Sequence, residues 1–177
     1  TRKESSAASD VYKRQPHYFA RGNGFYGSTG SDPVARVAAL ERVIGGLHQS
    51  IGSRQAFLLW LQQHVPGKGN GHVIRANDAT LSHVEVAVCT TGDAHLVSTL
   101  ALPDGLFHHQ QTSADPMMLG FAAHRVLREN LGRYDWYCYL EDDLLISDPY
   151  FFTKLEWFVS EHGEETTLSP HRFERSL

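Results

Sequence analysis

The stretch Tyr134–Phe158, YDWYCYLEDDLLISDPYFFTKLEWF, changes character three times along its length. Trp136–Leu140 is a short apolar and aromatic run, which is typical of a strand covered on both faces. Three consecutive acids, Glu141–Asp143, follow it directly, and the Phe-rich segment after Asp148-Pro149 predicts a helix. Adjacent carboxylates at the end of a buried strand repel one another and lose hydration, so a cation or a set of donors must compensate them. The pattern therefore indicates a functional site.

The first residues of the chain resemble material of another origin. Ser5–Gln15, SSAASDVYKRQ, resembles the translated read-through of a transposase-type sequencing adapter. Such scars are excluded from fold reasoning. We therefore interpret residues 1–15 as a non-native tail and residues 16–177 as one partial domain, a fragment of a longer protein.

Composition excludes several classes of partner. The formal net charge is −4, and no Lys/Arg cluster is interleaved with aromatic residues, so we expect no nucleic-acid groove. No run approaches the roughly 18 to 20 apolar residues of a membrane span. Cys89 and Cys138 lie inside apolar runs and are predicted to be reduced core residues, which favours a cytoplasmic location.

Strands are predicted at several places. The clearest is His83–Thr91, in which valines alternate with other residues. The others are His17–Arg21, Leu106–Gln111, Trp136–Leu140 and Thr166–Phe173. The apolar block Phe57–Leu61 is too short to separate strand from helix, and helix is favoured. Val65–Ala79, rich in glycine, is predicted to be a surface loop.

Three Asp-Pro pairs predict helix starts, because Asp is a good N-cap and Pro suits the first helical position. The helices are expected to follow Asp32-Pro33 as far as Gly52, Asp115-Pro116 as far as Asn130, and Asp148-Pro149, with a further short helix within Ala94–Leu102. Alternating strands and helices predict an α/β protein with a mainly parallel sheet and flanking helices.

Two elements are expected at the carboxyl ends of the strands, where ligands gather in such sheets. One is Glu141–Asp143, and the other is the glycine-rich loop Gly22–Ser31. The loop lacks the G-x-x-x-x-G-K-[ST] pattern, and a plain flexible connection is the alternative. His108 and His109 are interpreted as ordinary polar residues, because neighbours on a strand point to opposite faces and do not readily chelate one ion.

The carboxylates suit a hard divalent cation. Mg²⁺ and Mn²⁺ prefer oxygen ligands and commonly bind through one or two carboxylates together with substrate phosphates. Because successive residues leaving a strand alternate in direction, Glu141 and Asp143 are expected to share one side while Asp142 faces the other. The alternative is an acidic turn in which Glu141 and Asp142 are solvated and Asp143 bonds the following backbone.

The segment Tyr139–Leu144, YLEDDL, resembles the metal-binding D-x-D motif of GT-A fold glycosyltransferases. Over Leu140–Phe158 it is locally similar to the N-acetylglucosaminyltransferase I family. The order of elements from Pro16 to Phe173 resembles the Rossmann-like, nucleotide-binding half of that fold.

This resemblance implies a metal-dependent glycosyltransferase that transfers a sugar from a nucleoside-diphosphate sugar, with a UDP-sugar favoured, to an unknown acceptor. By position, Asp143 would bind Mn²⁺ or Mg²⁺, with Asp142 as a second ligand or a donor contact and Glu141 as the ribose partner. Arg21 and Tyr26 are candidate nucleotide contacts. No catalytic base is named, because in that fold it normally lies beyond this region.

Three alternatives stay open. Arg125 is a candidate diphosphate contact, but a solvated helix face would explain it equally. The whole chain would alternatively be a non-catalytic GT-A-like domain in which the acids form a structural turn. The same carboxylates would also suit a metal-dependent phosphate-cleaving enzyme.

Overall fold

The computed structural model describes residues 10–24, 27–52, 57–61, 71–75 and 83–174. Its main sheet contains four parallel strands: β1 (Asp10–Pro16), β4 (His83–Thr91), β5 (His108–Thr112) and β6 (Trp136–Tyr139). Their order across the sheet is β5-β4-β1-β6. The protein therefore has the predicted α/β fold with a parallel sheet flanked by helices.

The strand order defines where the chain changes direction. From β1 the chain adds β4 and then β5 on one side, and it then crosses back to place β6 on the other side of β1. Counted along the chain within this sheet, the order is 3-2-1-4, which is that of doubly wound nucleotide-binding sheets. The switch point lies between the carboxyl ends of β1 and β6, and this is where such sheets bind ligands.

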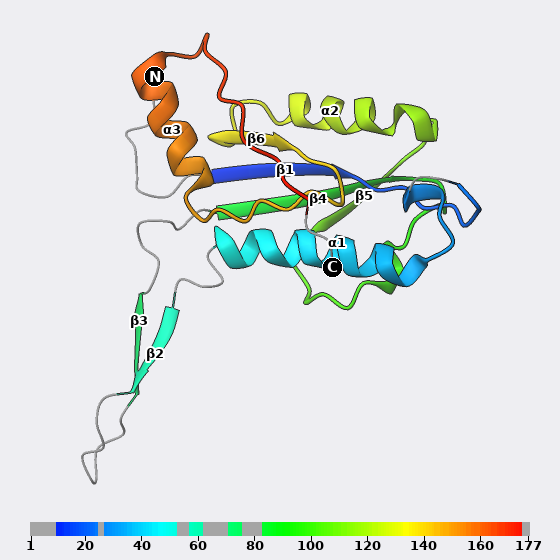
Figure 1. Ribbon diagram of the computed structural model, residues 1–177, viewed down its shortest axis with the longest axis horizontal. Helices are drawn as coiled ribbons and strands as arrows, with labels where there is room; N and C mark the ends of the chain where they lie inside the picture. Colours follow the sequence, from blue (N-terminus) through cyan, green and yellow to red (C-terminus); the bar gives the residue numbers. More distant parts are fainter. Residues whose placement is uncertain (1–9, 25–26, 53–56, 62–70, 76–82, 175–177) are drawn as a thin grey trace.

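Helices cover both faces of the sheet (Figure 1). Helix α1 (Pro33–Ser50) lies on one face and α2 (Leu119–Glu129) on the other, while α3 (Phe151–His162) lies near the end at which β6 begins. Short 3₁₀ turns occur at η1 (Gly27–Thr29), η3 (Val97–Thr99) and η4 (Pro116–Met118). No helix in the described part of the chain is both long and apolar enough to cross a membrane.

Two of the three predicted helix starts have the expected Asp cap, whereas the N-cap of α3 is Tyr150, which makes no side-chain hydrogen bond. The Asp32 side chain accepts hydrogen bonds from the backbone N–H groups of Val34 and Ala35, both at 3.0 Å, so α1 is capped as expected. Its C-cap is Ile51, one residue before the expected Gly52. Asp115 caps η4 through Met117 N at 2.8 Å, and α2 follows directly.

The core forms on both sides of the central strands. Val84, Val86 and Val88 of β4 lie in one buried cluster with apolar residues of α1, including Leu40 and Ile44. On the other face, Cys89 packs with Leu119 and Ala123 of α2. Cys89 and Cys138 are both free thiols, as predicted.

The prediction of the first strand is wrong. The strand is Asp10–Pro16 and not His17–Arg21, so residues 10–15, assigned above to a non-native tail, form an inner strand of the sheet. β1 pairs with β4 from Asp10 to Pro16. The backbone N–H groups of Phe19 and Ala20 instead donate to Ala94 and Ser28, which ends the ladder. The non-native origin of residues 1–15 stays a prediction.

The composition of β1 is unusual for its position. Inner strands of parallel sheets are ordinarily apolar, yet Lys13 and Gln15 are 0% exposed and Arg14 is 2% exposed. Lys13 Nζ donates to Gln15 Oε1 at 2.6 Å, and the Arg14 guanidinium donates to Gln110 and to Cys89 Sγ. Arg14 Nε and Gln15 Nε2 are buried without a hydrogen-bond partner in the described structure. Such groups oppose folding.

Four predictions of secondary structure away from β1 are also wrong. Phe57–Leu61 is the strand β2, which pairs antiparallel with β3 (Gly71–Arg75) inside the predicted loop, and Figure 1 shows this hairpin away from the main sheet. Ala94–Leu102 contains only the short η3. Thr166–Phe173 is exposed and forms no strand. Whether a short run becomes a strand depends on whether it finds a partner strand, which local periodicity does not report.

The strand before the acids is less buried than expected. β6 lies at the edge of the described sheet, and Tyr139 is 36% exposed. Its other residues are half-buried, with Trp136 packed against Phe152 of α3 at a ring-centroid distance of 6.2 Å. An apolar run predicts a strand but does not say how many of its sides are covered.

Lys13 of β1 is a buried amine whose charge should destabilise the folded state at neutral pH. Burial lowers the pKa of Lys13 from its ordinary value of 10.5 to about 8. Below about pH 8 the buried ammonium opposes folding, and between pH 8 and 10.5 the folded state releases a proton that the unfolded state retains. Lys13→Met is therefore expected to raise the free energy of unfolding at neutral pH by about 1–4 kcal/mol, and the gain should shrink as the pH rises toward about 10.

Urea denaturation of the wild type and of Lys13→Met across this pH range measures the change in the free energy of unfolding. Subtracting one value from the other at each pH cancels the contributions of the other titrating groups. Lys154→Met is the matched control, because the Lys154 side chain is 62% exposed. It should change stability by less than about 1 kcal/mol. A Lys13→Met variant less stable than the wild type at neutral pH would contradict the prediction.

Candidate functional site

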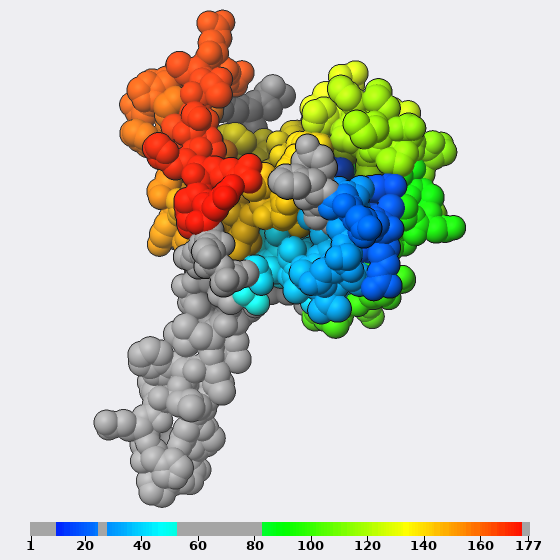
Figure 2. Space-filling view, turned by 45° about the vertical axis from the view of Figure 1, so that its right-hand side comes forward, coloured from blue at the N-terminus to red at the C-terminus, as the bar shows by residue number. Residues whose placement is uncertain are grey.

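Three segments meet around one carboxylate at the switch point. His17 follows β1, Arg36 lies in the first turn of α1, and Asp142 lies in the turn after β6. His17 Nδ1 is 2.5 Å from Asp142 Oδ2, and Arg36 Nη2 donates to Asp142 Oδ1. The Asp142 side chain is only 6% exposed. Figure 2 shows the residues after β1 and the start of α1, in blue, beside the yellow to orange segment that follows β6.

The orientation of the three acids follows from the strand before them. Leu140 N–H donates to Arg14 O at 3.1 Å, so pairing with β1 continues to the residue before Glu141. Leu144 N–H then donates to Glu141 O at 3.3 Å and closes a turn. Asp142 points inward, whereas Glu141 and Asp143 are exposed. The predicted alternation of the acids is therefore confirmed.

The hydrogen bonds of His17 orient its ring between Leu96 and Asp142. Leu96 N–H donates to His17 Nε2 at 3.1 Å, so this nitrogen carries a lone pair. The ring proton then lies on Nδ1 and is donated to Asp142. The guanidinium of Arg36 supplies a positive charge directly beside Asp142. The negative charge of Asp142 also acts on Lys13, where it offsets part of the lowering of the pKa caused by burial.

Arg36 contacts the second acid as well. Its Nη1 lies 3.6 Å from Asp143 Oδ2, while Nη2 is bound to Asp142. The Arg36 side chain is 13% exposed, and that of Asp143 is 54% exposed. One guanidinium thus spans a buried carboxylate and an exposed one.

The glycine-rich loop after β1 is folded upon itself. Ala20 N–H donates to Ser28 O at 2.9 Å and Gly24 N–H donates to Thr29 O at 2.8 Å. A Cβ at Gly24 would lie 1.9 Å from Thr29 Oγ1, so this close approach requires glycine. Arg21 is exposed at the start of the loop, near the switch point. Tyr26, the other predicted nucleotide contact in this loop, lies outside the described residues.

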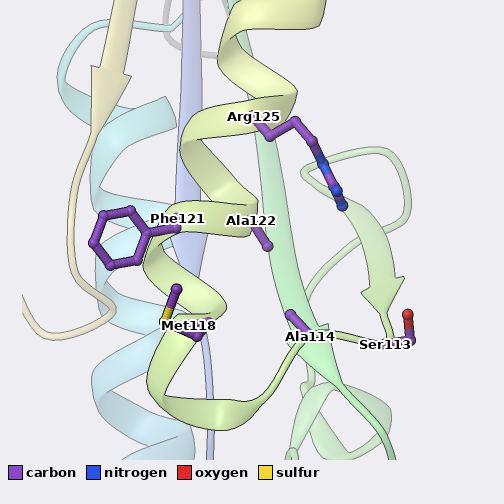
Figure 3. Close-up of a pocket in the computed structure, with 6 residues that line it drawn as sticks. All are labelled: Ser113, Ala114, Met118, Phe121, Ala122 and Arg125. Carbon is purple, nitrogen blue, oxygen red and sulfur yellow. The ribbon is translucent and has the colours of Figure 1, made fainter.

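Arg125 does not reach the acids. It lies on an exposed face of α2, where its Nε is 3.9 Å from Glu129 Oε1. Figure 3 shows it extending along a shallow pocket, away from Phe121. The pocket is lined by Ser113, Ala114, Met118, Phe121, Ala122 and Arg125. The contact with Glu129 supports the interpretation of a solvated helix face.

A second polar cluster lies between β4 and β5. Thr90 Oγ1 is 2.8 Å from His109 Nε2, and the rings of His95 and His109 are 4.8 Å apart. Burial, followed by the nearby His95 and His17, lowers the pKa of His109. His108 instead faces Glu85, with its Nε2 3.7 Å from Oε1. The adjacent histidines therefore have different surroundings, in agreement with their interpretation as ordinary polar residues.

The available carboxylates suit a metal ion held jointly by the protein and a substrate better than one held by protein ligands alone. Among the described residues, no group of three or more His, Cys, Asp or Glu side chains is arranged to hold a metal ion. Both Asp142 oxygens are engaged by protein donors, which leaves Asp143 as the more available carboxylate. Mg²⁺ and Mn²⁺ are commonly held by one or two carboxylates, waters and substrate phosphates, and Asp143 fits that arrangement.

Comparison with models of known protein families, with curated proteins and with solved structures finds no match to this chain. The residues and their geometry therefore carry the information about function. The central feature of that geometry is the arrangement of three charged or polar groups at the switch point, His17, Arg36 and Asp142.

Two residues of this site were missed from the sequence. His17 was assigned to a strand, and Arg36 was not singled out within its helix. They lie 125 and 106 residues from Asp142 in the chain, so no local motif connects them. The only signal was the cost of three adjacent acids, which required donors without identifying them.

Asp142 and Asp143 are expected to differ in their contribution to stability. Asp142→Ala removes the partner of a buried guanidinium and should lower the free energy of unfolding by about 3–5 kcal/mol. Asp143→Ala removes an exposed carboxylate with one long contact and should cost less than about 1 kcal/mol. Thermal and urea unfolding of the two variants measure this, with each variant as the control for the other. Equal losses of stability would contradict the structural role assigned to Asp142.

Proposed function

We propose that this chain is the nucleotide-binding part of a metal-dependent glycosyltransferase, which transfers a sugar from a nucleoside-diphosphate sugar to an acceptor. The observation that carries the proposal is the exposed carboxylate of Asp143 beside the fixed carboxylate of Asp142, at the carboxyl ends of β1 and β6. Doubly wound sheets bind nucleotides at this point. The sequence resemblance of YLEDDL to the D-x-D motif supports the same conclusion.

Each acid has a separate role in this proposal. Asp143 would ligate Mn²⁺ or Mg²⁺, and Glu141, also exposed, would contact the ribose or the donor sugar. Asp142 keeps the turn in place through His17 and Arg36 and would be a contact behind the metal ligand. When bound, the cation would neutralise negative charge on the departing diphosphate.

The glycine-rich loop provides the opposite side of the site. It connects β1 to the first turn of α1, and exposed Arg21 lies near its start. A guanidinium suits the phosphates or the base of a nucleotide, because it presents several donors in a planar fork. Arg21 would therefore bind the nucleotide from the β1 side while the acids bind it from the β6 side. A UDP-sugar is the proposed donor class.

One observation favours a structural turn as the second candidate function. The hydrogen bond from Leu144 N–H to Glu141 O and the two partners of Asp142 would stabilise this segment without any ligand. A non-catalytic domain of the same fold would then bind no metal nucleotide. A phosphate-cleaving enzyme using the same acids would differ from both by releasing free phosphate.

Titration of the purified chain with UDP, with and without Mn²⁺, tests the proposal. UDP binding is expected to tighten at least about tenfold when Mn²⁺ is present, because Asp143 would hold the cation and the cation would offset the negative charge of the diphosphate. Asp143→Asn should remove this enhancement, and its fold should remain intact because the side chain is exposed. Isothermal titration calorimetry measures both effects.

Glu156→Gln is the matched control, because it removes one negative charge from an exposed position on α3. It should leave the enhancement by Mn²⁺ unchanged. UDP binding that is indifferent to Mn²⁺, or unchanged in Asp143→Asn, would overturn the glycosyltransferase proposal. Phosphate released from simple phosphate esters would favour the hydrolase.

A further inference from the structure

The guanidinium of Arg36 lies beside the two aspartates of the acidic turn, where a positive charge offsets their repulsion. It lies in the first turn of α1, and it contacts Asp142 through Nη2 and Asp143 through Nη1. Its Nε is buried and has no hydrogen-bond partner in the described structure. A positive charge of the protein itself therefore compensates the two acids when no ligand is bound.

The contact of Arg36 with Asp142 is buried, whereas its contact with Asp143 is partly exposed to solvent. Asp142 is buried and is also bound by His17, so its pairing with Arg36 belongs to the folded core. Asp143 is 54% exposed, and the distance between Nη1 and its Oδ2 is 3.6 Å. Exposed ion pairs of this kind contribute little to stability and are readily replaced. A competing cation would therefore displace Arg36 from Asp143 while Arg36 stays on Asp142.

We propose that Arg36 is an internal counter-ion that competes with the divalent cation for Asp143 and then, once displaced, donates to a phosphate oxygen of the nucleotide. This inference rests on the proposed function, because it concerns the same site. A cation alone meets a like charge beside Asp143, which weakens its binding. When a diphosphate binds with the cation, the freed Nη1 gains an anionic acceptor, and Arg–phosphate hydrogen bonds are strong.

The consequence is cooperativity between the two ligands. Arg36 opposes binding of the metal alone but favours binding of the metal together with the diphosphate. Such a coupling is reciprocal, so each ligand raises the affinity of the site for the other by the same factor. A purely structural arginine, tied only to Asp142, would leave this coupling factor unchanged.

Arg36→Lys separates the two roles. The ammonium of lysine keeps a positive charge for buried Asp142 but lacks the planar fork with which arginine spans two carboxylates. Mn²⁺ alone is therefore expected to bind Arg36→Lys about two- to fivefold more tightly than the wild type. The factor by which UDP tightens Mn²⁺ binding should fall by at least about threefold, because one donor to the phosphate is lost.

The experiment is a titration with Mn²⁺, followed by calorimetry, in the absence of UDP and at saturating UDP. It compares the wild type, Arg36→Lys and Arg42→Lys. Arg42 is exposed on the same helix and provides the matched control, which should behave as the wild type. Circular dichroism and the midpoint of thermal unfolding establish that each variant is folded.

The outcomes separate this inference from the proposed function. If Arg36→Lys binds Mn²⁺ no more tightly than the wild type, or keeps the full coupling with UDP, Arg36 is not a competing counter-ion. The proposed function still stands in that case, provided that Asp143→Asn loses metal-dependent UDP binding. If no protein binds Mn²⁺ with or without UDP, both conclusions fail. Tighter Mn²⁺ binding together with weaker coupling in Arg36→Lys alone supports the inference.

Discussion

The buried carboxylate of Asp142 is the constraint on which the carboxyl edge of the sheet depends. Its two partners come from segments far apart in the chain, His17 after β1 and Arg36 at the start of α1. An uncompensated charge at this depth would cost several kcal/mol, so these contacts fix the relative positions of the three segments. The direction of Asp143 follows, because it is the next residue along a turn whose centre is anchored.

The same edge shows why the site lies between β1 and β6. β1 leads into the glycine-rich loop and α1, whereas β6 leads into the acidic turn. Strands β4 and β5 are added on one side of β1, and β6 is added on the other. Loops that leave neighbouring strands on opposite courses open a crevice between them. His17, Arg36 and the acids meet at this edge from three different segments of the chain.

β1 combines a well-placed backbone with poorly suited side chains. It pairs with β4 and β6, yet it buries Lys13, Arg14 and Gln15 where parallel sheets usually bury valine or isoleucine. The backbone ladder is satisfied by any residue other than proline, which explains how such a segment is accommodated. The polar side chains are only partly hydrogen-bonded, because two of their nitrogens are buried without a partner in the described structure.

The sequence by itself determined the features that depend on neighbouring residues. The caps at Asp32 and Asp115, the strand His83–Thr91 and the alternation of Glu141, Asp142 and Asp143 follow from rules that span a few positions. Tertiary structure alone decided that β1 begins at Asp10, that Phe57–Leu61 pairs with Gly71–Arg75, and that β6 lies at an edge. It also decided that Asp142 is held by His17 and Arg36. The physical reason is that strand pairing and buried ion pairs join residues by their distance in space, which local periodicity does not encode.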